Sequence, residues 1–224
     1  MEGTMFKAIL PILIFTGMIL TACGGESVPE KTQQANDNEE TNGAEQNEKQ
    51  ESTETDDDVE GTLWEADGEL GVVLSHGAAY DADSWGDQGE QFAENNVTAF
   101  AVEDTNEEGL LEAAEWLKEE QGVEKVAVLG ASAGGASAIE AVEKDDTIFD
   151  KVALLSPGGD ATSIKDTPVL VVYSEEEGFE DLEENQPENL ETLQVSGDAH
   201  AQEMFQDEEK SAEVMKKIMA FLEE

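Results

Sequence analysis

A serine flanked by glycines, in Gly130-Ala-Ser-Ala-Gly134, is the stretch best suited to chemistry. It matches G-x-S-x-G, in which a sharp strand-to-helix turn exposes a serine hydroxyl as a nucleophile. Glycine suits such a turn because larger side chains beside the serine would clash with neighbouring backbone. The apolar run Val126–Leu129 precedes the serine, and a helix-like segment over residues 136–142 follows it. The pattern predicts that Ser132 is a nucleophile, with amides at the helix N-terminus available to an oxyanion.

The alternative is a glycine-rich turn that packs closely or holds a phosphate. The chain has neither G-x-G-x-x-G nor G-K-[ST] at this place, so both nucleotide-binding patterns lose their key residues. The sequence therefore favours the nucleophile.

A nucleophilic serine needs a base, and the chain has only two histidines. His76 follows the first apolar run, upstream of the serine, and His200 follows the last one. In a sheet of the predicted kind the chain order is serine, acid, histidine, which selects His200. The acid is then expected after the penultimate run, where Ser174-Glu-Glu-Glu-Gly178 offers several carboxylates.

These side chains must be positioned by strands and helices that alternate along the chain. The predicted strands are Val72–Ser75, Val97–Val102, Val126–Leu129, Val152–Leu155, Val169–Tyr173 and Leu193–Val195. Apart from the weaker run Leu193–Val195, they are continuous rather than alternating, as in parallel strands buried on both faces. Helical spacing is seen at Leu110, Ala113, Ala114 and Leu117, and again at Met215, Ile218, Met219 and Leu222. The sequence predicts an α/β doubly wound fold, mostly parallel, with ligands beyond the carboxyl ends of the strands.

Four motifs in order resemble those of small α/β-hydrolases without a lid domain, akin to the dienelactone-hydrolase-like and lysophospholipase-like members. They are Leu74-Ser-His-Gly-Ala-Ala-Tyr-Asp-Ala-Asp-Ser-Trp85, Gly130-Ala-Ser-Ala-Gly-Gly135, Thr167-Pro-Val-Leu-Val-Val-Tyr173 and Gly197-Asp-Ala-His-Ala201. The resemblance covers the chain from about residue 70 to its end. Dienelactone hydrolases proper use a cysteine nucleophile, so their particular chemistry does not carry over to Ser132.

The resemblance implies roles for further residues. The family's acid lies three residues past a small residue that ends the strand, which maps from Ser174 to Glu177. The usual residue there is Asp, and Glu176 competes for the same role.

The family's His-Gly loop maps to His76 and Gly77. It implies that the amides of Ala78 and Ala133 form the oxyanion hole and that His76 orients the loop. The resemblance implies a small-molecule ester as substrate and no cofactor.

A calcium loop is suggested by Asp81, Asp83, Gly86 and Asp87, but the EF-hand pattern fails at two positions. Trp85 occupies an expected ligand position, and Phe92 stands where the bidentate Glu should be. We expect no metal here, and instead the start of a helix with Trp85 packed inward.

The N-terminus reads as an export signal followed by a tether. Lys7, an apolar run over residues 8–20 and Leu20-Thr-Ala-Cys23 resemble a bacterial lipoprotein signal, residues 1–22, with lipidation, typically by palmitate, at Cys23. The polar, acidic range 23–60 predicts a disordered tether. The hydrolase domain is then residues 61–224, held at the extracellular side of the cell membrane.

The charge is strongly acidic, with 55 Asp and Glu against 11 Lys and Arg and a formal net charge of −44. Nucleic acids would be repelled and are excluded as partners. A solvated acidic surface suited to a salty, halophilic setting explains the composition, and self-repulsion should destabilise the fold at low salt.

Together these features predict a membrane-tethered serine hydrolase of carboxylic esters or thioesters, working through an acyl-enzyme on Ser132. Two alternatives remain open at this stage. One is a non-catalytic, surface-displayed binding domain that has lost its acid geometry. The other is an acyltransferase that uses the same nucleophile with an acceptor other than water.

Overall fold

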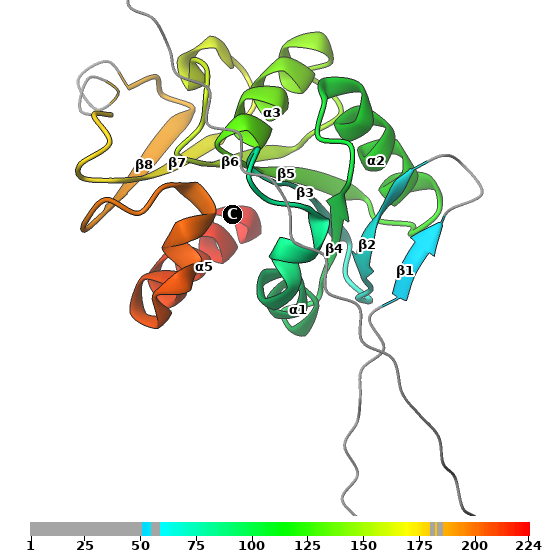
Figure 1. Ribbon diagram of the computed structural model, residues 1–224. Helices are drawn as coiled ribbons and strands as arrows, with labels where there is room; N and C mark the ends of the chain where they lie inside the picture. The colour runs from blue at the N-terminus through cyan, green and yellow to red at the C-terminus, as the bar shows by residue number, and fades with distance from the viewer. Residues whose placement is uncertain (1–50, 55–58, 180–181, 183–185) are drawn as a thin grey trace, which may run out of the picture. The chain divides into compact units, whose positions relative to one another are not determined.

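The fold is an eight-stranded β-sheet with helices on both faces (Figure 1). The computed structural model describes residues 51–54, 59–179, 182 and 186–224. The predicted signal peptide, Cys23 and the predicted tether up to residue 50 lie outside these ranges. Within them, no helix is both long enough and apolar enough to span a membrane.

The sheet is parallel except at one edge. Its strands lie in the order β1-β2-β4-β3-β5-β6-β7-β8. Strand β2 pairs antiparallel with both β1 and β4, and every other neighbouring pair is parallel. The strands are β1 (Glu51–Glu54), β2 (Glu60–Trp64), β3 (Leu70–Ser75), β4 (Val97–Val102), β5 (Lys125–Ala131), β6 (Lys151–Leu155), β7 (Val169–Ser174) and β8 (Leu190–Val195). This arrangement confirms the predicted doubly wound α/β fold.

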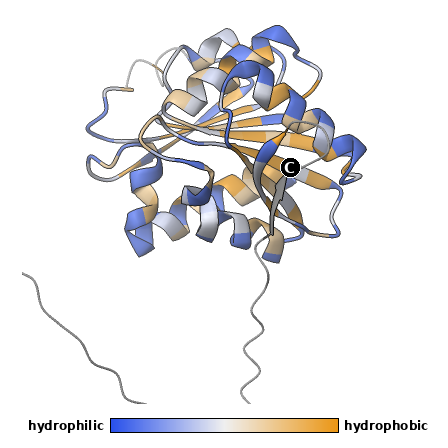
Figure 2. Cartoon of the chain, turned by 45° about the vertical axis from the view of Figure 1, so that its right-hand side comes forward, coloured by the Kyte–Doolittle hydropathy of each residue, from blue (hydrophilic) through white to orange (hydrophobic). Residues whose placement is uncertain are grey.

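Both faces of the sheet are buried, which explains why the strands read as unbroken apolar runs. Val72 and Leu74 of β3 pack into one core, whereas Val73 between them packs into the other. Helices cover each face, so hydrophobic strands lie between layers of helices with hydrophilic outer surfaces (Figure 2). The helices are α1 (Gly86–Glu94), α2 (Glu107–Glu119), α3 (Ala133–Lys144) and α5 (Glu208–Glu223).

Helices α2 and α5 begin at residues whose side chains satisfy one of the first helical amides. The Asn106 side chain accepts a hydrogen bond from the Gly109 amide at 2.8 Å, and Asp207 accepts one from the Lys210 amide at 2.9 Å. Such capping fixes where α2 and α5 start. Before α1, the 3₁₀ helix η1 (Ala82–Trp85) carries Trp85 fully into the core, as the sequence predicts.

Two strands at the antiparallel edge were not predicted from the sequence. Strand β1 has the sequence Glu-Ser-Thr-Glu, which carries no apolar signal, and it lies inside the range 23–60 assigned to the tether. Strand β2 buries Leu63 only partly and Trp64 almost fully. Both strands are defined by backbone pairing to a neighbour, which composition does not encode.

The parallel strands bring their carboxyl ends to one edge of the sheet. The segments that begin at His76, Ser132, Ser156, Glu175 and Ser196 follow β3, β5, β6, β7 and β8 in turn. Because neighbouring parallel strands point the same way, these segments start side by side. The chemistry predicted from the sequence is therefore expected at this edge.

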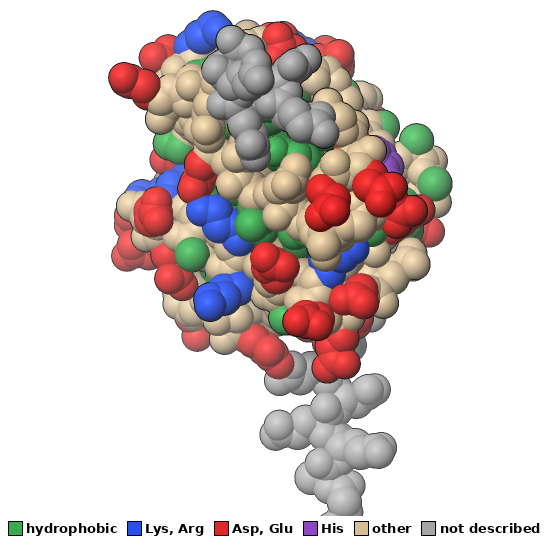
Figure 3. Space-filling view, turned by 90° about the vertical axis from the view of Figure 1, so that its left-hand side faces the viewer, with side chains coloured by type: hydrophobic (Ala, Val, Ile, Leu, Met, Phe, Trp, Pro, Cys, Tyr) green, Lys and Arg blue, Asp and Glu red, His purple; other side chains and the backbone are tan. Residues whose placement is uncertain are grey.

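The described surface is acidic over a wide area rather than at one spot. Figure 3 shows Asp and Glu side chains spread across the visible face, with few lysines between them. Lysine pairs with acid at Lys144–Glu108 (2.9 Å) and Lys217–Glu191 (2.5 Å). Spread charge of one sign is self-repulsive, and salt screens it.

We expect the melting temperature of the purified protein to rise by roughly 5 °C or more between about 0.1 M and 2 M KCl, because the Debye length falls from about 10 Å to below 3 Å. Differential scanning calorimetry measures it, with sucrose of equal osmolality as the control for solute exclusion. A melting temperature that stays flat or falls with salt contradicts this account of the acidity.

Candidate active site

Ser132 lies at a strained turn between β5 and α3. Its φ is 50° and its ψ is −110°, a backbone conformation that residues other than glycine rarely adopt. Neighbouring backbone holds it there: the Ser132 amide donates to the Leu155 carbonyl at 2.9 Å, and the Ser132 carbonyl accepts from the Gly158 amide at 2.9 Å. The turn leaves the side chain half-buried at the carboxyl edge of the sheet.

The glycines around Ser132 are required by close backbone packing. A Cβ on Gly130 would lie 2.7 Å from the Gly134 carbonyl oxygen, and one on Gly134 would lie 2.4 Å from the Ser75 carbonyl oxygen. A Cβ on Gly135 would meet the Pro157 Cβ at 2.9 Å. The glycines of the G-x-S-x-G pattern thus let β3, β5 and the start of α3 meet backbone to backbone.

His200 joins the serine to a carboxylate. Its Nε2 lies 2.8 Å from Ser132 Oγ, and its Nδ1 lies 2.6 Å from Glu177 Oε1. An ionised carboxylate only accepts hydrogen bonds, so Nδ1 must carry the proton and Nε2 is left to accept from the Ser132 hydroxyl. The His200 side chain is 51% exposed and that of Glu177 only 11%. The imidazole is therefore open to a substrate while the acid behind it is shielded.

Glu177, and not Glu176, is the acid beside His200. Its second oxygen, Oε2, accepts from the Ser174 amide at 2.7 Å and from Ser156 Oγ at 2.6 Å. The Glu177 amide returns a bond to the Ser174 carbonyl at 3.0 Å, which closes a tight turn after β7. Glu176 is exposed, and its amide donates to the Gly197 carbonyl. The structure thus separates two neighbours that the sequence left in competition.

Ser156 belongs to the site, although sequence analysis did not single it out. It follows β6, is 1% exposed and has a φ of 41°. Its hydroxyl donates to Glu177 Oε2 and accepts from the Ala201 amide at 3.1 Å. It therefore holds both the acid and the residue after His200. Its position directly after a predicted strand was the one available signal.

The His-Gly loop lies alongside Ser132. A Cβ on Gly77 would lie 3.5 Å from Ser132 Cβ, and His76 Nδ1 lies 2.9 Å from the Gly77 carbonyl oxygen. Ala78 is exposed next to this glycine, and Ala133 is exposed as the first residue of α3. The amide of a first helical residue has no partner within its own helix, so it is free to bind an anion.

A buried glutamine, also missed from the sequence, ties this loop to the histidine segment. Gln202 is 5% exposed and lies in the 3₁₀ helix η3 (Ala201–Gln206). Its Oε1 accepts from the Gly77 amide at 2.8 Å, and its Nε2 donates to Ser84 Oγ at 2.7 Å. The carboxamide thus fixes the loop after β3 against the segment after β8.

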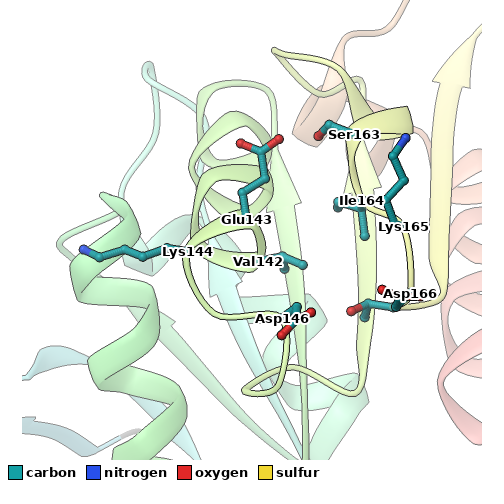
Figure 4. A pocket seen from close by; sticks show the side chains of 9 residues that line it. Val142, Glu143, Lys144, Asp146, Ser163, Ile164, Lys165 and Asp166 are labelled. Carbon is teal, nitrogen blue, oxygen red and sulfur yellow. The ribbon is translucent and has the colours of Figure 1, made fainter.

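A hollow of about 370 Å³ lies away from Ser132 and His200, between the C-terminal end of α3 and residues 163–167 (Figure 4). None of the predicted catalytic residues borders it. Lys144 points away from it, and the hydrogen bond to Glu108 raises the pKa of that lysine. Among the described residues, no group of three or more His, Cys, Asp and Glu could hold a metal ion.

The architecture and the placement of the site at the carboxyl edge are those of the α/β hydrolases. The chain belongs to the prolyl oligopeptidase family, whose match covers residues 78–224. The family and the esterase and lipase neighbours identify a serine hydrolase-type enzyme. None of the curated proteins matches the chain significantly.

Three solved structures illustrate the shared fold. One is a predicted CIB-like hydrolase from Thermoplasma acidophilum, at 16% identity and a TM-score of 0.59, covering 73% of this chain and 91% of that one. A monoacylglycerol lipase from Paleococcus ferrophilus has 16% identity and a TM-score of 0.59, covering 73% and 98%. The α/β hydrolase GrgF from Penicillium has 14% identity and a TM-score of 0.61, covering 73% and 93%.

We expect Ser156→Ala to lower kcat for a short-chain aryl ester about tenfold while KM changes little, because Glu177 loses a buried donor that positions it. Steady-state kinetics give the two constants separately. Ser163→Ala is the matched control, since the Ser163 hydroxyl is buried without a partner among the described residues. Equal kcat values for the two variants contradict a positioning role for Ser156.

Proposed function

We propose that the protein hydrolyses carboxylic esters or thioesters through an acyl-enzyme on Ser132. The observation that carries this proposal is the unbroken chain of short hydrogen bonds from Ser132 Oγ through the His200 ring to Glu177. A nucleophile, a base and a group that orients the base are the three parts that such catalysis needs.

In the acylation half, Ser132 Oγ attacks the carbonyl carbon while its proton passes to His200 Nε2. Glu177 stabilises the imidazolium and keeps the ring oriented. The amides of Ala78 and Ala133 stabilise the oxyanion, each such donor being worth about 3 kcal/mol. The imidazolium then protonates the departing alcohol or thiol, which leaves the acyl group on Ser132.

In the second half, His200 takes a proton from water, and the resulting hydroxide attacks the acyl carbon. Collapse of the tetrahedral intermediate returns the proton to Ser132 and releases the acid. The 51% exposure of the His200 side chain supports this step, because water has to reach Nε2. The same exposure admits an alcohol or amine as acceptor, which is the acyl-transfer alternative.

Hydrolysis of a peptide bond is a second candidate, favoured by the match to the prolyl oligopeptidase family. The same three residues serve either bond, but the amine of a peptide leaves only after full protonation. Comparison of an aryl ester with the matching peptide anilide distinguishes the two activities. Faster turnover of the anilide would favour the peptidase.

We expect Ser132→Ala to abolish both ester turnover and labelling by a fluorophosphonate probe without loss of the fold. Glu177→Gln should lower kcat by up to about 10⁴-fold, as when a triad acid is made neutral, because the imidazole loses its orienting charge. Glu176→Gln is the matched control and should retain activity. Turnover in Ser132→Ala equal to that of the wild type would refute the mechanism, and similar losses in the two glutamine variants would refute the role of Glu177.

We also propose that the enzyme acts at the outer face of the membrane, anchored by a lipid on Cys23. The support is the sequence Leu20-Thr-Ala-Cys23 after an apolar run, with no other cysteine in the chain. We expect Cys23→Ser to release the full-length protein from the membrane fraction and to abolish incorporation of labelled palmitate. Membrane retention of the variant equal to that of the wild type would contradict the anchor.

A further inference from the structure

A second hollow, of about 280 Å³, lies beside the predicted oxyanion loop. It is bordered by the loop after β3, by the first turn of α1 and by η3, the segment that follows His200. Tyr80, Asp83, Asp87, Gln88, Phe205 and Gln206 are among the residues that line it.

Gln88 is the residue that marks this hollow as a binding site. It is 4% exposed, and its side chain has no hydrogen-bond partner in the described part of the chain. A carboxamide offers two donor hydrogens and an acceptor oxygen. Gln202, buried to the same extent in the same wall, has both of its polar atoms paired. Gln88 lines the hollow and is not among the residues whose unpaired polar atoms are fully shielded from solvent, so a ligand in the hollow can reach its carboxamide.

The charges around the hollow select the kind of ligand. Asp83 and Asp87 are exposed at its border, and no lysine lines it. Tyr80 and Phe205 add aromatic rings, and Phe205 is held by an edge contact with Trp85 at 6.0 Å between ring centroids. Carboxylates and aromatic rings attract a cation that carries N–H donors, and the carboxamide oxygen can accept a hydrogen bond from it. The carboxylates repel an anion.

Gln202 links the hollow to the loop beside Ser132. This residue lines the hollow and also accepts from the Gly77 amide at 2.8 Å. A Cβ on Gly77 would in turn lie 3.5 Å from Ser132 Cβ. Neither Ser132 nor His200 borders the hollow, so a substrate bound at Ser132 would have to pass over the Gly77 loop to reach it.

We propose that this hollow binds a primary ammonium group of the substrate, so that the enzyme prefers esters that carry an amino group away from the reacting carbonyl. This inference rests on the proposed hydrolase function. Gln88 accepts a hydrogen bond from the ammonium, and Asp83 and Asp87 neutralise its charge.

The test compares ester substrates of equal length whose far end is an ammonium, a methyl or a carboxylate group. One series varies the acyl chain of 4-nitrophenyl esters, and the other varies the alcohol of butanoate esters. We expect kcat/KM for the ammonium ester to exceed that for the methyl ester by about tenfold in at least one series. This is the gain expected from two exposed charge pairs, between the ammonium and the two aspartates. The carboxylate ester should be the poorest substrate. Salt should reduce the preference, because the two carboxylates are exposed.

Matched variants locate the effect. Asp83→Asn with Asp87→Asn should lower the ammonium-to-methyl ratio about tenfold, and Gln88→Leu should also lower it. Glu90→Gln with Glu94→Gln removes the same charge from exposed positions of α1 that do not line the hollow, so the ratio should be kept. Equal kcat/KM for ammonium and methyl esters in both series, or an equal loss in the two double variants, overturns the proposal. If no ester is cleaved and no fluorophosphonate labels Ser132, the hydrolase function itself fails instead.

Discussion

The backbone contact at Gly134 is the constraint on which the rest of the site depends. There the start of α3 approaches the end of β3 so closely that even a methyl group would lie 2.4 Å from a carbonyl oxygen. This approach forces the turn after β5 to be abrupt, and Ser132 takes a φ of 50° within it. The same contact brings the His-Gly loop next to the serine. One close backbone contact therefore places Ser132, the proposed nucleophile, beside the loop that is proposed to stabilise the oxyanion.

In the proposed triad, a glutamate can replace the more usual aspartate because its longer side chain is held at both oxygens. Glu177 Oε1 meets His200, while Oε2 accepts from the Ser174 amide and the Ser156 hydroxyl. These bonds fix the extra rotatable bond of glutamate and offset the conformational entropy that fixing it costs. Because the acid is only 11% exposed, its charge acts on the imidazole through a medium less polar than water. The geometry thus argues against a domain that has lost its acid.

The sequence was informative where a residue's role depends on its neighbours in the chain. The strands β3 to β7 appear as apolar runs, and Ser132 is marked by glycines within two residues of it. Ser156 and Gln202 carry no such mark, because their partners lie 45 and 125 residues away in the chain. Glu176 and Glu177 are chemically alike, and only the turn after β7 distinguishes them. Strand β1 has no apolar residue and is defined by its pairing with β2 alone. What the sequence could not provide is therefore the set of long-range polar contacts.

Gln202 connects the chemistry at Ser132 with the proposed binding of the rest of the substrate. Its carboxamide holds the Gly77 amide on one side and Ser84 of the hollow on the other. Both polar atoms are used and the residue is buried, so the loop after β3 cannot shift without leaving a costly unpaired group. Ser84 also donates to the Asp81 carbonyl, which extends the same network to the start of η1. A ligand in the hollow would contact Gln202 and Ser84, and Gln202 holds the loop that is proposed to form the oxyanion hole. Binding energy gained away from the reacting carbonyl can in this way contribute to kcat as well as to KM.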